Sequence, residues 1–337
     1  MGIIFVLGAS KLSRGGLVPS ILNDNICIVI VRSNLQTEDD LNFKVYRNGK
    51  HIYNEVVISD NTFLTQGIPL KQGNDKNVFV ISEESFRQYL KNEKHINAIS
   101  ICRDGIFSYV SDMVSAGAEA FVVSFDNNAS LAKDANTKSE KVTVKKGVAH
   151  YVVTDVSVDI DKNRIDIVAD ESTPMFIFPP ASEKYFGILH QEGICIFTKN
   201  QKEFDLYVLC KLLFINGFHT LMAMYAYLLE GLNPTVADSS FNQLLFFDVI
   251  VKEARKVLAQ SIKMRETDIP RDYIYEWSYF HKHFVEYIET HDEETVGRAA
   301  GFDKASKEKV NNHYEYFKCI DERLDALLIR YLSFQRD

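Results

Sequence analysis

Three polar side chains in a long apolar run, Lys211, Asn216 and His219, are of the types that carry out proton transfer. The run covers residues 206–229, LYVLCKLLFINGFHTLMAMYAYLL, and could form about six turns of helix. Steps of five and eight residues turn about 140° and 80° beyond whole turns, so the three side chains share one sector of that helix. A lysine is rarely fully buried without a partner or a task, and burial lowers its pKa toward that of a general base. The pattern indicates an acid–base lysine with two hydrogen-bonding neighbours.

Two other interpretations of this run carry no chemistry. The run could be a core helix that accommodates three polar groups, and spacing alone leaves that interpretation open. It also exceeds the 18 apolar positions that suggest a membrane span. A lysine at the centre of a span costs roughly 2.5–3.5 kcal/mol, and the asparagine and histidine would add to that cost. We therefore reject the membrane span.

The composition is that of a soluble globular protein with room for two domains. The chain has 337 residues, of which 46% are hydrophobic and 25% charged. The net charge of −8 argues against a nucleic-acid partner. The 5 cysteines are scattered without a CxxC pair, so we expect neither a disulfide framework nor a zinc site. The apolar segment 3–7 is too short for a signal peptide, and a reduced, cytoplasmic setting fits.

A strand, a glycine-containing turn and a helix start open the chain and predict a dinucleotide-binding crossover. Residues 3–7 are an apolar strand, followed by GASKLSRGG at residues 8–16. Such a turn brings backbone N–H groups at a helix N-terminus close to a pyrophosphate. Gly8 holds the first glycine position of the dinucleotide fingerprint, whereas Ser10 and Ser13 replace the second and third. An ordinary strand-to-helix turn is the alternative.

The end of the second strand predicts which cofactor binds. The strand at residues 27–31 runs into Arg32 and Ser33, where NAD-specific domains place an acidic residue for the ribose 2′-hydroxyl. A cation and a hydroxyl suit a 2′-phosphate, so we expect NADP(H) to be preferred over NAD(H). A solvated surface arginine is the alternative.

The rest of the chain predicts an α/β fold with a helical second half. The pattern favours a hairpin around Asn48–Gly49, and we expect Thr137 to Lys146 to be a mobile surface segment. Further strands are expected at residues 78–81, 98–101, 120–124, 152–160 and 164–171, and helices at 83–90, 105–116, 239–263, 271–290 and 303–333. We predict an N-terminal Rossmann-like dinucleotide-binding domain with inserted strands at residues 1–199 and a mainly α-helical C-terminal domain at residues 200–337.

The spacing K-x4-N-x2-H of Lys211, Asn216 and His219 resembles the catalytic signature of the polyol-specific long-chain dehydrogenases, the mannitol dehydrogenase family. Within it the chain is most similar to the mannitol-1-phosphate 5-dehydrogenases. Their GxGxxGRG turn is matched at Gly8, Arg14 and Gly15. Their C-[DE]-N motif is matched at Asn127, which follows the strand at residues 120–124, with Phe125 in place of the cysteine.

The resemblance implies a metal-independent reaction in which Lys211 is the general acid and base. Asn127 and Asn216 would donate hydrogen bonds to the oxyanion, and His219 would orient a neighbouring hydroxyl. Cofactor contacts are implied at Gly8, Ser10, Leu12, Ser13 and Arg14, in addition to Arg32 and Ser33.

The implied reaction interconverts fructose 6-phosphate and mannitol 1-phosphate. A non-phosphorylated polyol or a hexuronate as substrate is one alternative. A non-catalytic nucleotide-binding protein and a helical scaffold with a Rossmann-like domain are others. The small-molecule substrate is the expected partner, without nucleic acid or membrane, and both a monomer and a homodimer are compatible with the sequence.

Overall fold

The computed structural model describes residues 2–33, 35, 40–69, 77–101, 105–125, 140–150, 153–169, 174–191 and 194–211. The chain divides into two compact units, Met1–Phe204 and Asp205–Asp337, and nearly all described residues belong to the first. The predicted boundary between residues 199 and 200 stays a prediction. The helices expected at 239–263, 271–290 and 303–333 lie outside the described residues.

The centre of the first unit is a parallel sheet in the strand order of a dinucleotide-binding fold. The strands, in spatial order, are β5 (Asn77–Ser82), β2 (Ile26–Arg32), β1 (Gly2–Leu7), β6 (His95–Ser100), β7 (Glu119–Ser124) and β8 (Val142–Lys146). Each pairs in parallel with its neighbour. Numbered along the chain without the insertion, the order is 3-2-1-4-5-6, which defines the Rossmann fold. The predicted dinucleotide-binding architecture is confirmed at the level of fold.

A hairpin inserted between β2 and β5 widens this sheet. Its strands are β3 (Leu41–Arg47) and β4 (Lys50–Val57), and β4 runs parallel to β5. Asn48 and Gly49 have φ values of 47° and 77°, the left-handed pair that a tight hairpin turn requires. The Asn48 amide donates to the carbonyl of Ala169 at 2.8 Å and accepts from the N–H of Ala169 at 3.1 Å. These bonds hold the turn against Ala169, the last residue of strand β11 (Arg164–Ala169). The predicted inserted hairpin is confirmed.

Two further strand groups complete the described sheets. β11 (Arg164–Ala169) joins β3 in parallel, and β10 (Val153–Asp159) pairs antiparallel with β11 at the edge. A separate small sheet contains β9 (Val148–His150), β12 (Met175–Phe178) and β13 (Cys195–Phe197).

The prediction of a mobile segment at residues 137–146 is wrong for its second half, because residues 142–146 form the strand β8. Val142 and Val144 are 2% and 0% exposed and alternate with polar side chains. This is the pattern of a strand with one buried face, which the high lysine content obscured. Residues 137–139 lie outside the described residues.

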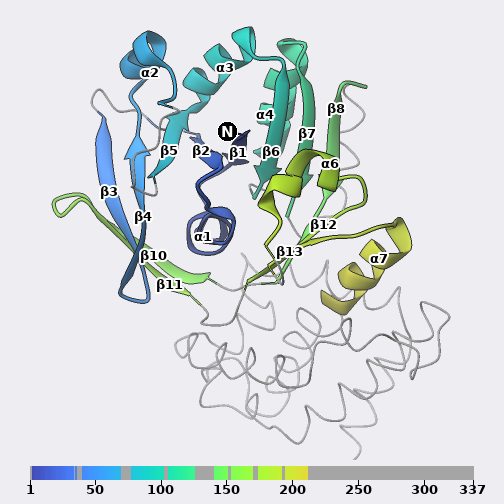
Figure 1. Ribbon diagram of the computed structural model, residues 1–337. Coiled ribbons are helices and arrows are strands. Elements are labelled where there is room, and N and C mark those ends of the chain that lie inside the picture. The colour runs from blue at the N-terminus through green and yellow to red at the C-terminus, as the bar shows by residue number, and fades with distance from the viewer. Residues whose placement is uncertain are drawn as a thin grey trace, which may run out of the picture. The chain divides into compact units, whose positions relative to one another are not determined.

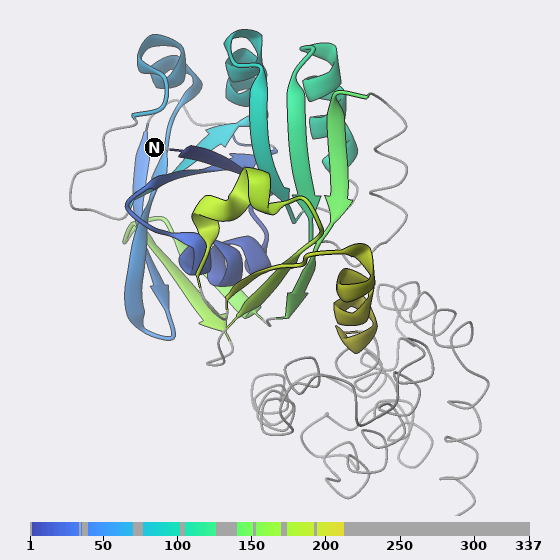
Figure 2. The same ribbon diagram turned by 45° about the vertical axis from the view of Figure 1, so that its right-hand side comes forward.

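Both faces of the central sheet are covered, which explains why its strands are apolar without alternation. Helices α2 (Asp60–Gln66), α3 (Glu83–Asn92) and α4 (Ile106–Ser115) cover one face, where Phe5 and Leu7 point. The other face, with Ile4 and Val6, packs against a helical segment at residues 11–21 and against β12 (Figures 1 and 2). The segment begins with residues 11 and 12 and continues through a π-helical turn, η1 (Ser13–Leu17), into α1 (Val18–Ile21). The short helices α6 (Glu183–Phe186) and η2 (Gly187–Leu189) and the helix α7 (Gln201–Cys210) complete the described elements.

Phe125 sets a close contact beyond the end of β7. Its ring is 3% exposed and lies edge-on to Phe176 and Phe178, with centroid distances of 5.4 and 5.3 Å. A Cβ at Gly147 would lie 2.5 Å from the Cε1 atom of that ring and 2.8 Å from a methyl group of Val123. Residue 147 therefore has no room for a side chain while Phe125 holds this position.

We expect Gly147→Ala to destabilise the first unit by about 1–3 kcal/mol, the usual cost of overpacking a filled core. Chemical denaturation of the variant measures the loss. Gly187→Ala is the matched control, because its added methyl would meet its nearest neighbour at an ordinary 3.6 Å. Phe125→Leu combined with Gly147→Ala should recover part of the loss. Equal stability of the two alanine variants would contradict the proposed contact.

Candidate dinucleotide site

The candidate site lies where the connections of the parallel sheet change direction. From β1 the chain continues to β2 on one side, whereas β6 lies on the other side of β1 and is reached from β5 through α3. In open α/β sheets, ligands bind at the carboxyl ends of the strands on either side of this point. Gly8 N–H donates to Val31 O at 2.9 Å, and Ile101 N–H donates to Leu7 O at 3.1 Å. The ends of β1, β2 and β6 are therefore tied together at one edge.

The turn after β1 shows what the altered glycine pattern does. Gly8 has φ +94°, a conformation that favours glycine. Ser10 caps the following helix: its hydroxyl accepts from the N–H of Ser13 at 3.2 Å. The hydroxyl of Ser13 donates in turn to the carbonyl of Ser10 at 2.7 Å. Ser13 is fully buried, and Leu12 packs against the core. The two serines thus build the helix start, and Ser13 is small enough for the close packing that the third glycine normally allows.

Arg14, for which the resemblance implies a cofactor contact, forms a buried ion pair within the first unit. Its guanidinium forms two parallel bonds with Glu55 of β4, Nε to Oε2 at 2.9 Å and Nη2 to Oε1 at 2.5 Å. The two side chains are 8% and 1% exposed. The hydroxyl of Tyr53 also donates to the Arg14 carbonyl at 3.3 Å. The guanidinium is thus engaged in the core, and these contacts give no support to a cofactor contact by Arg14.

Glu55 and Tyr53 were not singled out from the sequence, although their alternation with Val57 along the hairpin strand indicates inward-facing side chains. Tyr53, Glu55 and Val57 alternate along β4 and are all buried. A glutamate between two inward positions of a strand calls for a buried cation. Burial raises the pKa of Tyr53 well above its usual value, with the charge of Glu55 adding to the rise. Tyr53 is therefore protonated at neutral pH and serves as a hydrogen-bond donor.

Arg32 and Ser33, which are predicted to contact the ribose end of the cofactor, lie at the carboxyl end of β2. Arg32 is the last residue of β2, and both side chains are exposed. Its register partner on β5 is Ser82, also the last residue of its strand. A cation thus stands at the carboxyl edge of the second strand, the position that reads the ribose 2′ substituent in this fold.

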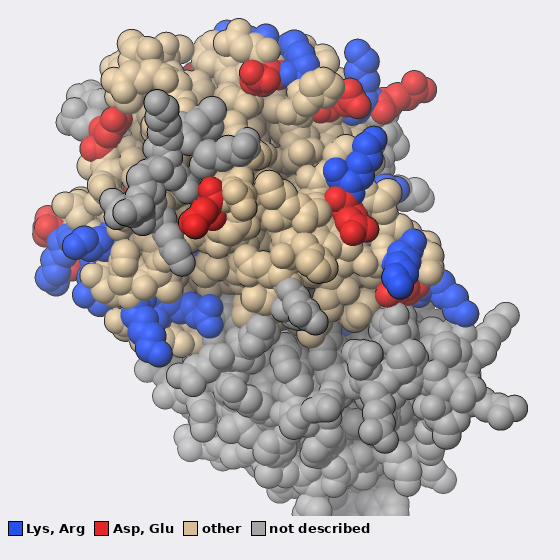
Figure 3. Space-filling view, viewed as in Figure 1, with Lys and Arg blue, Asp and Glu red and all other residues tan. Residues whose placement is uncertain are grey.

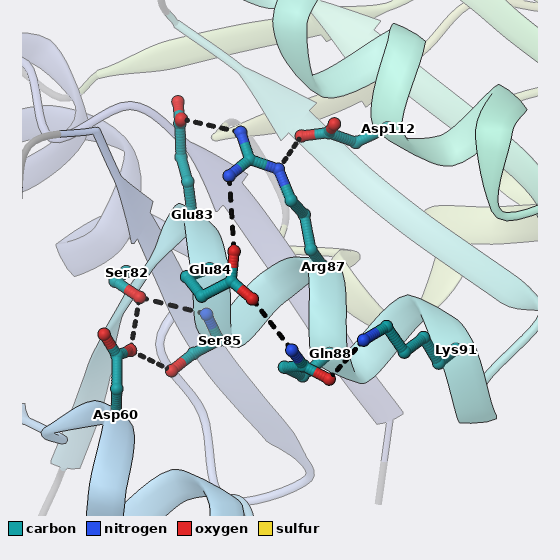
Figure 4. Close-up of polar contacts among 9 residues, drawn as sticks. All are labelled: Asp60, Ser82, Glu83, Glu84, Ser85, Arg87, Gln88, Lys91 and Asp112. Carbon is teal, nitrogen blue, oxygen red and sulfur yellow. Dashed lines mark hydrogen bonds and ion pairs between the residues drawn. The ribbon is translucent and has the colours of Figure 1, made fainter.

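Asp60 joins the starts of α2 and α3 (Figure 4). One oxygen of Asp60, at the start of α2, accepts hydrogen bonds from the hydroxyls of Ser82 and Ser85, each at 2.5 Å. Ser82 caps α3 by accepting from the N–H of Ser85 at 3.0 Å, and Ser59 caps α2. An anion in this place is favoured by both helix dipoles. Asp60 therefore connects α2 of the inserted segment to α3.

A second group in Figure 4 ties α3 to α4. The guanidinium of Arg87 lies 3.0 Å from a carboxylate oxygen of Asp112, 3.3 Å from Glu83 and 3.5 Å from Glu84. The Arg87 side chain is 41% exposed, and ion pairs in contact with water contribute little to stability. We therefore assign this group a minor structural role.

Of the implied catalytic residues, only Lys211 lies within the described residues. It is half-buried and directly follows α7. Because α7 contains residues 206–210, the start of the long apolar run is helical, as predicted. Asn127, Asn216 and His219 lie outside the described residues. Lys211 belongs to the second unit, so its meeting with these three residues and with the dinucleotide edge stays a prediction.

Among the described residues, no group of three or more His, Cys, Asp or Glu side chains is arranged to hold a metal ion. None of the helices in this part of the chain has the length and hydrophobicity of a membrane span. Charged side chains of both signs are scattered over the described part of the face in Figure 3.

Cys27 and Cys195 are buried free thiols, and burial raises their pKa values to about 11 and about 12.

A comparison with one solved structure agrees with the fold class, and two others have lower TM-scores. An octopine dehydrogenase in complex with NADH and L-arginine has a TM-score of 0.51 and 10% sequence identity, covering 94% of this chain and 90% of that chain. The 2-dehydropantoate 2-reductase from Porphyromonas gingivalis W83 has a TM-score of 0.47 and 11% identity, covering 98% and 99%. A D-mandelate dehydrogenase with NADH has a TM-score of 0.45 and 10% identity, covering 99% and 98%. No protein-family profile and no curated protein sequence matches the chain. At these identities the likeness concerns the fold alone.

Proposed function

We propose that this chain is a nicotinamide-dependent dehydrogenase that prefers NADP(H) and interconverts a ketose and a polyol. One observation carries the cofactor part of this proposal. The parallel sheet has the 3-2-1-4-5-6 order, and at its switch point Gly8, with φ +94°, precedes a helix that Ser10 caps. The octopine dehydrogenase of similar fold holds NADH, which is consistent with this assignment.

The described residues fit such a cofactor at both of its anionic groups. The helix that begins after Ser10 presents its N-terminus at the end of β1, where a pyrophosphate is stabilised by backbone N–H groups and the helix dipole. Arg32 and Ser33, exposed at the end of β2, would hold the 2′-phosphate of NADP(H). The bound nicotinamide supplies or accepts the hydride.

The proton chemistry is assigned to residues of the second unit and to Asn127, which follows β7 in sequence. Lys211 takes the proton of the reacting hydroxyl in oxidation and returns it in reduction. Asn127 and Asn216 donate hydrogen bonds to the developing oxyanion, and His219 orients the neighbouring hydroxyl. Loss of one such oxyanion donor costs on the order of 3 kcal/mol of transition-state stabilisation.

The substrate assignment rests on the K-x4-N-x2-H motif. We propose fructose 6-phosphate and mannitol 1-phosphate as the substrate pair, with a non-phosphorylated polyol or a hexuronate as the alternative within the same reaction class. An alternative from another functional class is a non-catalytic nucleotide-binding protein, which would keep the cofactor site. Ser10 and Ser13, which replace two glycines of the dinucleotide fingerprint, are the reason to consider it.

The first experiment follows absorbance of the reduced cofactor with fructose 6-phosphate, once with NADPH and once with NADH. Faster loss of signal with NADPH would support the reductase activity and the cofactor preference together. No loss with either cofactor would rule out this substrate, and a panel of free ketoses and hexuronates would follow. Nucleotide binding without turnover on the whole panel would leave the binding protein as the better proposal.

Arg32→Asp is expected to reverse the cofactor preference. The new carboxylate would repel a 2′-phosphate and accept a hydrogen bond from a ribose 2′-hydroxyl, so the ratio of kcat/KM for NADPH to that for NADH should fall by about a hundredfold or more. Lys91→Asp makes the same charge change at an exposed position in the last turn of α3 and serves as the control. A ratio that moves equally in both variants would show that Arg32 acts only through overall charge.

A further inference from the structure

We propose that Glu55 and Tyr53 of the inserted hairpin are positioning residues for the cofactor pyrophosphate, an inference that rests on the proposed function. They hold the helical segment 11–21 so that its first turn faces the carboxyl end of β1. The hairpin would then be part of the dinucleotide site although neither side chain touches the cofactor.

The Arg14 side chain fixes the segment in place and in orientation. A planar guanidinium bound through two parallel hydrogen bonds, here at 2.9 and 2.5 Å to Glu55, allows little rotation of either partner. The two groups come from elements that are 41 residues apart in sequence and are both buried. Desolvation makes such a pair a weak source of stability, so a role in specifying one geometry is the better explanation for it.

The Arg14 carbonyl gives a second, independent contact at the same point. In an α-helix this carbonyl would accept from the N–H of Val18, but Val18 N–H donates to Ser13 instead, closing the π-helical turn. The next residue, Pro19, has no N–H to offer. The hydroxyl of Tyr53, fully buried, donates to the carbonyl at 3.3 Å. The hairpin therefore completes the hydrogen bonding that this π-helical turn leaves open.

One backbone hydrogen bond connects the contacts of Arg14 with Glu55 and Tyr53 to the start of the helix at Ser10. The N–H of Arg14 donates to the carbonyl of Ser10 at 3.2 Å, and Ser10 also caps the helix through its side chain. The first turn is thus linked to Glu55 and Tyr53 through Arg14. The binding of an anion at a helix N-terminus depends on the direction of a few backbone N–H groups. A small rotation of this first turn therefore weakens binding of the pyrophosphate.

Isothermal titration of the full chain with two probes tests the proposal. NADPH contains the pyrophosphate, whereas adenosine 2′-monophosphate contains the adenosine and the 2′-phosphate without it. We expect Glu55→Gln to weaken NADPH binding between about ten- and a hundredfold, because it loosens the first turn. Tyr53→Phe removes a single hydroxyl and should weaken it about two- to tenfold. Binding of adenosine 2′-monophosphate should stay within about twofold in both variants.

Glu119→Gln is the matched control, since Glu119 is an exposed glutamate at the opposite, amino end of β7. Tyr53→Phe carries the test if Glu55→Gln does not fold. Unchanged NADPH binding in the folded variants, or equal weakening of both probes, would overturn the positioning role. A wild-type chain that binds neither probe would instead refute the proposed function, so the two failures are distinguishable.

Discussion

Substitution of Lys211 by alanine is expected to lower kcat by about a hundred- to ten-thousandfold, the usual contribution of a general acid–base group. The proposal makes Lys211 the group that exchanges a proton with the reacting hydroxyl. The residues proposed to contact the cofactor, Gly8, Ser10, Arg32 and Ser33, lie in the first unit, so the Kd for NADPH should stay near the wild-type value. Steady-state kinetics and titration calorimetry on the same preparation measure both quantities.

Two controls make this result specific to the lysine amine. Lys202→Ala removes an exposed lysine near the start of α7 and should leave kcat unchanged. Added ethylamine should restore part of the activity of Lys211→Ala, because a free amine can replace the missing proton donor. A variant that keeps its kcat would remove Lys211 from the mechanism. Activity that is lost without rescue and together with NADPH binding would indicate a structural role instead.

Glu55→Ala should strongly destabilise the first unit. It leaves the Arg14 guanidinium, only 8% exposed, without its counter-ion, and breaking a buried pair in this way costs about 3–5 kcal/mol. At about 2–4 °C per kcal/mol for a unit of this size, the thermal midpoint should fall by roughly 6–20 °C. Differential scanning calorimetry measures the shift.

A double variant separates the charge from the contact. Arg14→Met combined with Glu55→Met replaces both ions by apolar side chains of similar length, and such replacements are often neutral or stabilising. We therefore expect a thermal midpoint near that of the wild type, much higher than the sum of the single losses would allow. A double variant as unstable as Glu55→Ala would show that loss of the ion pair itself, and not the unpaired arginine, causes the destabilisation.

Most elements of the first unit could be predicted from short stretches of sequence. The Asn48–Gly49 pair supplies the two left-handed residues of the hairpin, and the apolar runs of β1 and β2 indicate strands buried on both faces. Ser82 followed by two glutamates gives the start of α3. The same reasoning failed at β8, where lysines concealed the buried Val142 and Val144. A short strand with only one buried face carries too few apolar positions to be distinguished from a loop.

The sequence by itself indicated most strands and helices of the central sheet, the turn at Gly8, the cation at Arg32 and the acid–base candidate at Lys211. These depend on residue type and local spacing. Only the tertiary structure decided that Arg14 pairs with Glu55, that Ser10 and Ser13 build a helix start, and that Phe125 requires a glycine at residue 147. The Arg14 and Phe125 contacts join segments distant in the chain and depend on which faces pack together. The serine contacts depend on backbone geometry. Residue spacing fixes neither.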